Sequence, residues 1–283
     1  MSLPLALAMA LTMCAFTANS LLNRLALADG EAGPASFAAL RLVSGAVVLV
    51  LLIVLRNPVG RLKANMNLGN ALALATYILG FSFAYVTLDA GFGALLLFGT
   101  VQLTMFSSVV FTNSEAIPIR RWVGAAMALA GLLWLLAPSS AESVSLSPAA
   151  LLMVLAGIGW GIYSLRGSRG TDPLAATAAS FLLATPVALV VYGMRPDTLN
   201  WRGAGLACVS GALTSGLGYA LWYRLLPQIN ATVAAVAQLT VPVLAAVAGV
   251  FILGEPFGVR LVLSGALVLG GVLIATVRIF VPR

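Results

Sequence analysis

The sequence predicts an all-α polytopic membrane protein with ten transmembrane helices, arranged as two inverted five-helix repeats around a central cavity. Three observations lead to this prediction. Hydrophobic residues make up 61% of the 283-residue chain and charged residues only 8%, against about 25% charged residues in a soluble domain. Apolar runs of about 20 residues, each long enough to cross a bilayer, recur from end to end. Segments of the first half also return in the second half.

Ten apolar runs can be placed in order along the chain. They cover about residues 3–24, 34–55, 67–88, 90–112, 118–137, 148–166, 173–193, 202–224, 230–252 and 259–280. No basic segment precedes the first run, so we expect a retained helix rather than a cleaved signal. Ten Lys and Arg residues fall on the side of Lys63 and Arg166, and four on the side of Arg195. Because short basic loops stay in the cytoplasm, we expect both termini to be cytoplasmic.

The two halves of the chain match each other in register. Glu115 and Glu255 stand 140 positions apart, and the residues after both match without a gap. In the first run of each half, Ser20 matches Ser164 at an offset of 144. The predicted repeats are residues 1–140 and 141–283. Because five is odd, the second repeat must enter the membrane inverted, and inverted repeats around a cavity are typical of alternating-access transporters.

Several short motifs point to a known family. They are Gly254-Glu255-Pro256, Phe16-Thr17-Ala18-Asn19, Leu40-Arg41, Asn230-Ala231-Thr232 and Val241-Pro242-Val243. With these motifs the chain resembles the drug/metabolite transporter superfamily, in its ten-helix EamA-type branch. Two positions depart from the family pattern: Gln102 stands where many members have proline, and Phe16 replaces a tryptophan that Trp160 keeps in the second repeat.

The resemblance implies a transporter of small solutes in the bacterial inner membrane, commonly an exporter of amino acids or other metabolites. Its expected partners are a small-molecule substrate and the lipid bilayer. We expect substrate-binding residues on the cavity side of several helices. The candidates are Asn19, Arg41, Tyr77, Phe98, Gln102, Trp160, Tyr163, Tyr219 and Gln238.

Arg41 is the one basic residue placed well inside an apolar run. Counted from Pro34 at 1.5 Å per residue, it lies roughly 10 Å inside the outer leaflet. A charge at that depth needs partners or water. Three roles remain open: contact with a substrate carboxylate, a structural clamp with Asn19 and Asn23 at similar depth on the first helix, or a side chain that snorkels toward the membrane surface.

Aromatic residues form stripes on three predicted helices. Tyr77 lies on one helical face with Phe81 and Tyr85, and Tyr219, Trp160 and Tyr163 extend the set. Such walls suit apolar or aromatic solutes. The alternative is an aromatic belt at the membrane interface, which we expect for Trp222 and Tyr223 but not for mid-span Tyr77.

Phe98, Gln102 and Gln238 are candidates near mid-membrane. A glutamine at this depth needs hydrogen-bond partners, either from a neighbouring helix or from a ligand. Pro186 and Pro242 interrupt backbone ladders and are predicted hinges. Three further residues, Gly157, Gly159 and Gly161, are expected to allow close helix packing.

The remaining composition argues against other functions. With no His and two Cys, we expect no metal site built on Cys or His and no cofactor. Basic residues are scattered rather than clustered, so no nucleic-acid partner is expected. We expect no enzyme, because His, a buried acid pair and a Gly-Lys-Ser/Thr loop are all missing. A drug carrier, a nucleotide-sugar carrier with a cation-rich cavity, and a membrane-embedded enzyme are the alternatives. Glu115 and Glu255 are expected to stabilise the starts of the helices that follow them, which disfavours a buried carboxylate as proton carrier.

Overall fold

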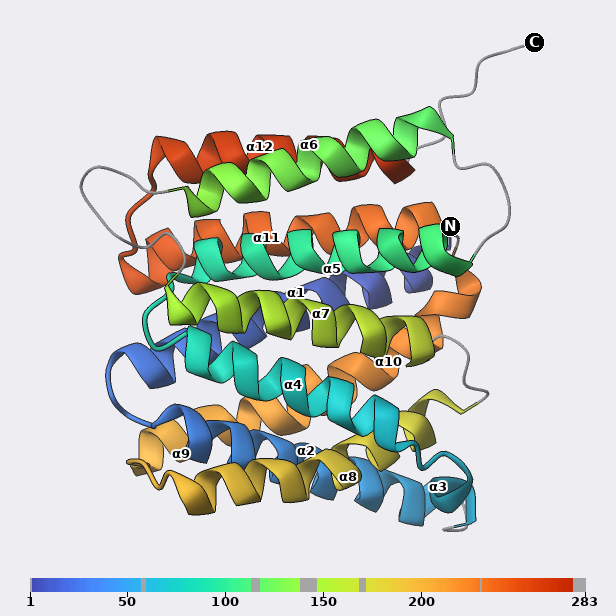
Figure 1. Cartoon of the computed structure of the whole chain (residues 1–283). Coiled ribbons are helices and arrows are strands. Elements are labelled where there is room, and N and C mark those ends of the chain that lie inside the picture. The colour runs from blue at the N-terminus through green and yellow to red at the C-terminus, as the bar shows by residue number, and fades with distance from the viewer. Residues whose placement is uncertain are drawn as a thin grey trace.

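The computed structural model describes residues 2–56, 60–112, 118–137, 147–167, 172–229 and 231–276. Its helices run side by side along one axis (Figure 1). Within those ranges, eight helices are long and apolar enough to cross a membrane, and two shorter apolar helices, Leu68–Ala84 and Val259–Ala275, bring the bundle to ten. The prediction of an all-α polytopic protein with ten membrane helices is confirmed.

The helix bounds follow the predicted runs closely. The first half holds α1 (Leu3–Ala28), α2 (Pro34–Arg56), the short α3 (Gly60–Ala64), α4 (Leu68–Ala84), α5 (Ala90–Thr112) and α6 (Ile119–Leu136). The second half holds α7 (Pro148–Gly167), α8 (Pro173–Met194), α9 (Trp201–Val209), the π-helix η1 (Ser210–Leu217), α10 (Gly218–Leu225), the 3₁₀-helix η2 (Leu226–Gln228), α11 (Ala231–Leu253) and α12 (Val259–Thr276). The α9, η1 and α10 segments together form one crossing.

Local sequence explains where several helices begin. Asn67, Asp172 and Asn200 each precede a helix, and each side chain accepts a hydrogen bond from a backbone N–H three residues later. This is the usual N-cap arrangement, which satisfies a donor left free by the first helical turn. The predicted run 67–88 is too long for α4, because the backbone N–H groups of Thr87 and Leu88 both turn back to the carbonyl of Ala84.

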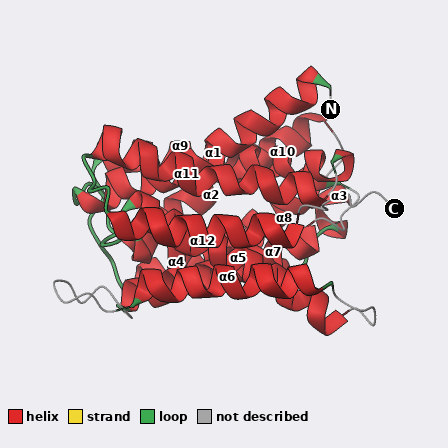
Figure 2. Ribbon diagram, turned by 90° about the horizontal axis from the view of Figure 1, so that it is seen from above, coloured by secondary structure: helices red, strands yellow, loops and turns green. Residues whose placement is uncertain are grey.

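The bundle has two edge pairs with a central group between them. Helices α6 and α12 pack together at one edge, and α2 and α8 at the other (Figure 1). Seen from above, α6 and α12 run side by side (Figure 2). Small residues let the helices approach: a Cβ on Gly124 of α6 would lie 2.7 Å from the backbone nitrogen of Ala275 on α12. On α7, a Cβ on Gly159 would lie 2.7 Å from the carbonyl of Ala73, and Gly157 and Gly161 face α5 in the same way. The predicted packing role of the three α7 glycines is confirmed.

Candidate functional site

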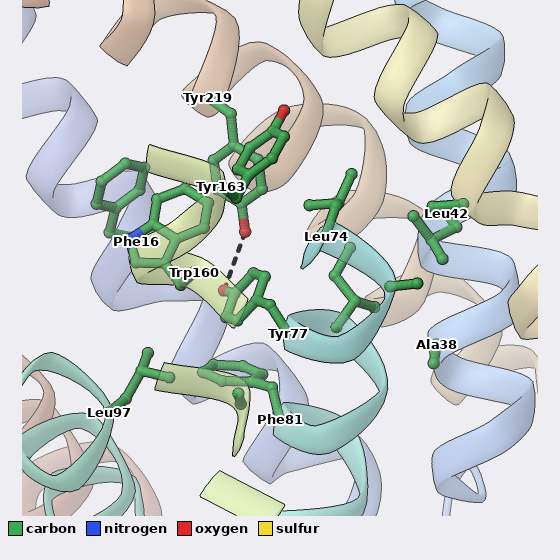
Figure 3. Packing of buried hydrophobic residues seen from close by; sticks show 14 of the residues in the cluster. Phe16, Ala38, Leu42, Leu74, Tyr77, Phe81, Leu97, Trp160, Tyr163 and Tyr219 are labelled. Carbon is green, nitrogen blue, oxygen red and sulfur yellow. Dashed lines mark hydrogen bonds between the residues drawn. The ribbon is translucent and has the colours of Figure 1, made fainter. Parts of the chain in front are cut away.

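Aromatic side chains from four helices meet at the centre of the bundle (Figure 3). Phe16 comes from α1, Tyr77 and Phe81 from α4, Trp160 from α7 and Tyr219 from α10. The ring centroid of Trp160 lies 4.6 Å from that of Tyr219 and 5.0 Å from that of Tyr77. The Tyr219 hydroxyl donates to the Tyr77 hydroxyl at 3.0 Å. The cavity between these rings measures about 10 Å³, room for about one water molecule, so aromatic packing closes the centre.

Arg41 of α2 lies behind the two tyrosines and is fully buried. Its Nε donates to Ser215 Oγ at 2.8 Å, and its Nη2 donates to the hydroxyls of Tyr77 at 3.2 Å and Tyr219 at 2.9 Å. The guanidinium also lies 5.2 Å from the ring centroid of Phe81. Its Nη1 has no hydrogen-bond partner among the described residues. Neutral hydroxyls and aromatic faces therefore stabilise this charge and fix the positions of Tyr77 and Tyr219 in return.

Asn19 of α1 binds the π-helix η1 at the same level. Its Oδ1 accepts from the hydroxyls of Ser210, Thr214 and Ser215 at 2.9, 2.6 and 3.1 Å. Segments of π-helix are rare and frequent at functional sites. Among the described residues Arg41 donates to Ser215, Tyr77 and Tyr219. Arg41 and Asn19 are therefore joined through Ser215 and Tyr219, which both also bond to Asn19.

A second, larger cavity of about 350 Å³ lies next to this cluster. It is bounded by α5, the last turn of α7, α10 with η2, and the first half of α11. Its lining residues are Gln102, Met105, Ser164, Leu165, Trp222, Leu226, Pro227, Ile229, Ala234 and Gln238, none of them charged. Gln102 follows Phe98 by one helical turn, and Ser164 follows Trp160 in the same way. The larger cavity therefore lies one helical turn beyond the aromatic cluster, toward the end of the bundle where α7 and α10 finish.

Two residues that line the larger cavity carry a side-chain atom with no protein partner. Gln238 is only 4% exposed, yet its Oε1 has no hydrogen-bond partner within the described ranges, and neither does Gln102 Nε2. Trp160 Nε1, beside the small central cavity, also lacks a partner within those ranges. Buried polar groups are normally paired. All three atoms are buried, so a polar solute in the larger cavity can bond to the acceptor Gln238 Oε1 and the donor Gln102 Nε2 only when these side chains turn toward it.

The opposite end of the bundle is closed by ion pairs. Arg24 at the end of α1 pairs with Glu255 Oε1 at 3.2 Å and with Asp89 Oδ1 at 3.4 Å. Glu255 also accepts from the backbone N–H of Ala90 at 2.8 Å. Burial raises the pKa of the Glu255 carboxyl, and this outweighs the opposite effects of the Ala90 N–H and Arg24. The prediction that Glu255 serves the helix after it is wrong, since it binds the start of α5; Glu115 lies outside the described residues.

Most predicted site residues line one of the two cavities. Asn19, Tyr77, Phe98, Trp160 and Tyr219 line the small central cavity, and Gln102 and Gln238 line the larger one. Tyr163 lines neither, and its ring stacks between Trp160 and Tyr223 at 5.7 and 5.5 Å. Pro186 and Pro242 lie inside α8 and α11, which continue through them. Pro242 lines a separate apolar cavity of about 280 Å³ between α5, α11 and α12.

Sequence reasoning missed some of the lining residues. Ser20 lines the small cavity and Ser164 the large one, and their match across the repeats was the signal that could have found them. The interfacial-belt prediction for Trp222 and Tyr223 is wrong, because the two side chains are only 1% and 3% exposed. Their position near a helix end is compatible with burial because α1, α7 and α8 surround α10.

Known proteins resemble this chain in sequence and in fold. The model of the EamA-like transporter family matches residues 147–277. An uncharacterized protein of Pseudomonas aeruginosa is 46% identical over 264 residues, which covers 93% of this chain and 91% of the relative. The uncharacterized transporter YwfM of Bacillus subtilis is 30% identical over 161 residues, covering 52% of this chain and 53% of the relative.

More distant similarity extends over the whole bundle. An uncharacterized transporter of Archaeoglobus fulgidus is 25% identical over 197 residues, covering 67% of this chain and 68% of the relative. A protein crystal structure that is 21% identical superposes with a TM-score of 0.65 over 94% of this chain and 97% of that one, which supports the fold. Family model, relatives and ten-helix fold agree, and this chain belongs to the EamA-like transporter family of the drug/metabolite transporter superfamily.

Proposed function

We propose that this protein exports small metabolites across the bacterial inner membrane by alternating access, with amino acids, aromatic ones included, as the preferred substrates. The observation that carries the substrate class is a pair of buried atoms without a protein partner, Gln102 Nε2 and Gln238 Oε1, on two residues that line the 350 Å³ cavity. A zwitterion offers a carboxylate to accept from the first and an ammonium to donate to the second. The aromatic rings beside the cavity suit an aromatic side chain.

The lining of this cavity argues against a nucleotide-sugar carrier. A diphosphate group would require several cations, and none of the described lining residues is charged. The buried cation nearby, Arg41, is engaged by Ser215, Tyr77 and Tyr219. The volume is also near the lower limit of about 300 Å³ for small-molecule sites. A solute of amino-acid size is the better match.

Contacts between helices support the two repeats, residues 1–140 and 141–283. We call two helices mates when they occupy the same position in the two repeats. If a two-fold axis relates the repeats, a helix either packs on its own mate, or it packs on another helix and the mates of these two helices pack on each other in the same way. The mates α2 and α8, α5 and α11, and α6 and α12 each pack on one another. The contact of α4 with α7 is likewise mirrored by the contact of α1 with α9, η1 and α10. This exchange fits an inverted duplication of the kind found in alternating-access carriers.

The orientation follows from the basic loops. The 350 Å³ cavity lies at the end of the bundle that carries Arg166 and Arg224, which the positive-inside bias places in the cytoplasm. The protein would therefore load its solute from the cytoplasm, with both termini on that side. Impermeant thiol labelling should find Lys63→Cys reactive only from the cytoplasm and Arg195→Cys only from outside. Reversed labelling would overturn the orientation.

We further propose that export is facilitated rather than proton-driven. In the described membrane helices no Asp or Glu lies away from an end, and the guanidinium of Arg41 keeps its proton, as arginine does in proteins. The experiment is transport of a labelled amino-acid panel and of a labelled nucleotide sugar in proteoliposomes, with and without a pH gradient. We expect saturable transport of aromatic amino acids that does not depend on the pH gradient, and no transport of the nucleotide sugar. Transport of the nucleotide sugar alone would refute the substrate class, and proton-driven accumulation would refute the facilitated mechanism.

A further inference from the structure

An ion-pair cluster joins both repeats at the end of the bundle away from the large cavity. We call Arg24, Asp89 and Glu255 the Arg24 cluster. Arg24 lies in α1, one turn before its last residue, Asp89 lies between α4 and α5, and Glu255 lies between α11 and α12. Arg24 also donates to the carbonyls of Tyr85 and Val86 at 3.2 and 3.0 Å. One guanidinium therefore holds together three segments, two from the first repeat and one from the second.

The cluster covers the route out of the aromatic centre. Ser20 lines the central cavity and lies one helical turn before Arg24, on the same face of α1. Tyr85, below the cluster, is fully buried, packs on Phe81 with ring centroids 4.6 Å apart and donates to the carbonyl of Ala90 at 3.2 Å. The side chains of Arg24 and Glu255 are 17% and 9% exposed. The opposite end contains the 350 Å³ cavity. The apolar cavity of about 280 Å³, which reaches Gly91 and Phe257 at the Arg24 end, shares no lining residue with the central cavity.

The contacts of Glu255 show how the cluster can open. Its carboxylate is held by Arg24 and by the N–H of Ala90 at the start of α5, where the positive helix terminus favours an anion. It follows Gly254, whose φ of 67° lies in the left-handed region and ends α11 with a sharp turn. A movement of the α11–α12 turn away from both α1 and α5 would break the two contacts of Glu255 together.

We propose that the Arg24 cluster is the outer gate of the solute pathway: it holds the outward end shut in the conformation described, and it must separate before the solute can leave. This inference rests on the proposed alternating access. Arg24 and Glu255 are then positioning residues: they control a conformational step and do not contact the solute. Thiol labelling measures access to the pathway without any transported solute. A failed labelling result would therefore reject the gate alone, and a failed transport result would reject the transport function alone.

The reporter is Ser20→Cys in a protein whose Cys14 and Cys208 are replaced by Ser. An impermeant cationic thiol reagent is added at the Arg24 end of protein reconstituted in vesicles. We expect slow labelling with the cluster intact and at least tenfold faster labelling after Arg24→Gln or Glu255→Gln. Arg24→Lys should keep labelling slower than Arg24→Gln does, because the positive charge that attracts Asp89 and Glu255 is retained.

Two controls separate gating from general loosening. Arg202→Gln breaks another ion pair between the repeats at the same end, that of Arg202 with Glu31 at 2.9 Å. It should leave the labelling rate of Ser20→Cys unchanged. A Ser180→Cys reporter, 2% exposed in α8 and outside the three cavities described, should stay unreactive in every variant. Equal Ser20→Cys rates with the cluster intact and broken would overturn the gate, and so would equal acceleration of both reporters.

Discussion

Gln238→Met should separate solute binding from folding. Methionine has a similar length and shape, so the packing of α11 is preserved, but the Oε1 acceptor is removed. That atom has no protein partner within the described ranges. A buried polar atom left unpaired costs about 1–3 kcal/mol, whereas a paired one contributes about 1 kcal/mol. The free energy of unfolding should therefore stay the same or rise by up to about 1 kcal/mol.

Solute binding should change in the opposite direction. If the substrate ammonium donates to Gln238 Oε1, its loss removes one charge-assisted hydrogen bond of at least about 1.5 kcal/mol. This corresponds to at least about a tenfold higher KM, since 1.4 kcal/mol is tenfold. The assay compares KM for the best transported amino acid in proteoliposomes with the thermal unfolding of the same detergent-purified samples.

A matched control uses the same substitution on another glutamine. Gln228 is outside the cavity lining, and its side chain donates to the carbonyl of Arg224 on the exposed surface. Gln228→Met should leave KM unchanged. An unchanged KM for Gln238→Met would refute the role of this atom in solute binding, and a large loss of stability would show that it serves helix packing instead.

Two further predictions concern the network and the backbone. Tyr77→Phe removes a hydroxyl that accepts from Arg41 and Tyr219, so thermal unfolding should show a loss of about 1 kcal/mol and transport should slow; full transport activity would place the pathway away from Tyr77. Gly211→Ala should destabilise the protein by about 1–3 kcal/mol, because its Cβ would overlap the carbonyl of Arg41. The control Gly205→Ala places its Cβ in open space and should stabilise α9 by about 0.5–1 kcal/mol. Equal effects of the two substitutions on chemical denaturation would refute the close contact of α2 with η1.

The number and approximate bounds of the membrane helices were predictable because they depend on local composition. Apolar runs bounded by polar turns can be recognised along the chain, and the N-caps Asn67, Asp172 and Asn200 lie where those runs begin. The π-helix η1 was not predictable in this way. It depends on how α2 passes over Gly211, where the carbonyl of Arg41 leaves no room for a side chain, and no local pattern encodes that contact.

The candidate site was predictable in its residue types and not in its pairings. The cost of burying a charge in the membrane indicated that Arg41 needs partners, but the identity of Ser215 and Tyr219 depends on the packing of α2 against the second half. Glu255 shows the same limit. Its sequence position favoured the start of the next helix, and the fold brings the start of α5 closer. Long-range contacts of this kind need the three-dimensional arrangement.

The most direct test of the central claim is protection of the large cavity by a transported solute. Ser164 lines that cavity on α7, so Ser164→Cys in the protein lacking Cys14 and Cys208 should react with a small thiol reagent added at the end that carries Arg224. We predict that a transported amino acid slows this labelling, with half-protection at a concentration close to its KM for transport, and that Gln238→Met raises both values together. A transported solute that leaves the labelling rate unchanged at saturating concentration would contradict the assignment of this cavity as the solute site.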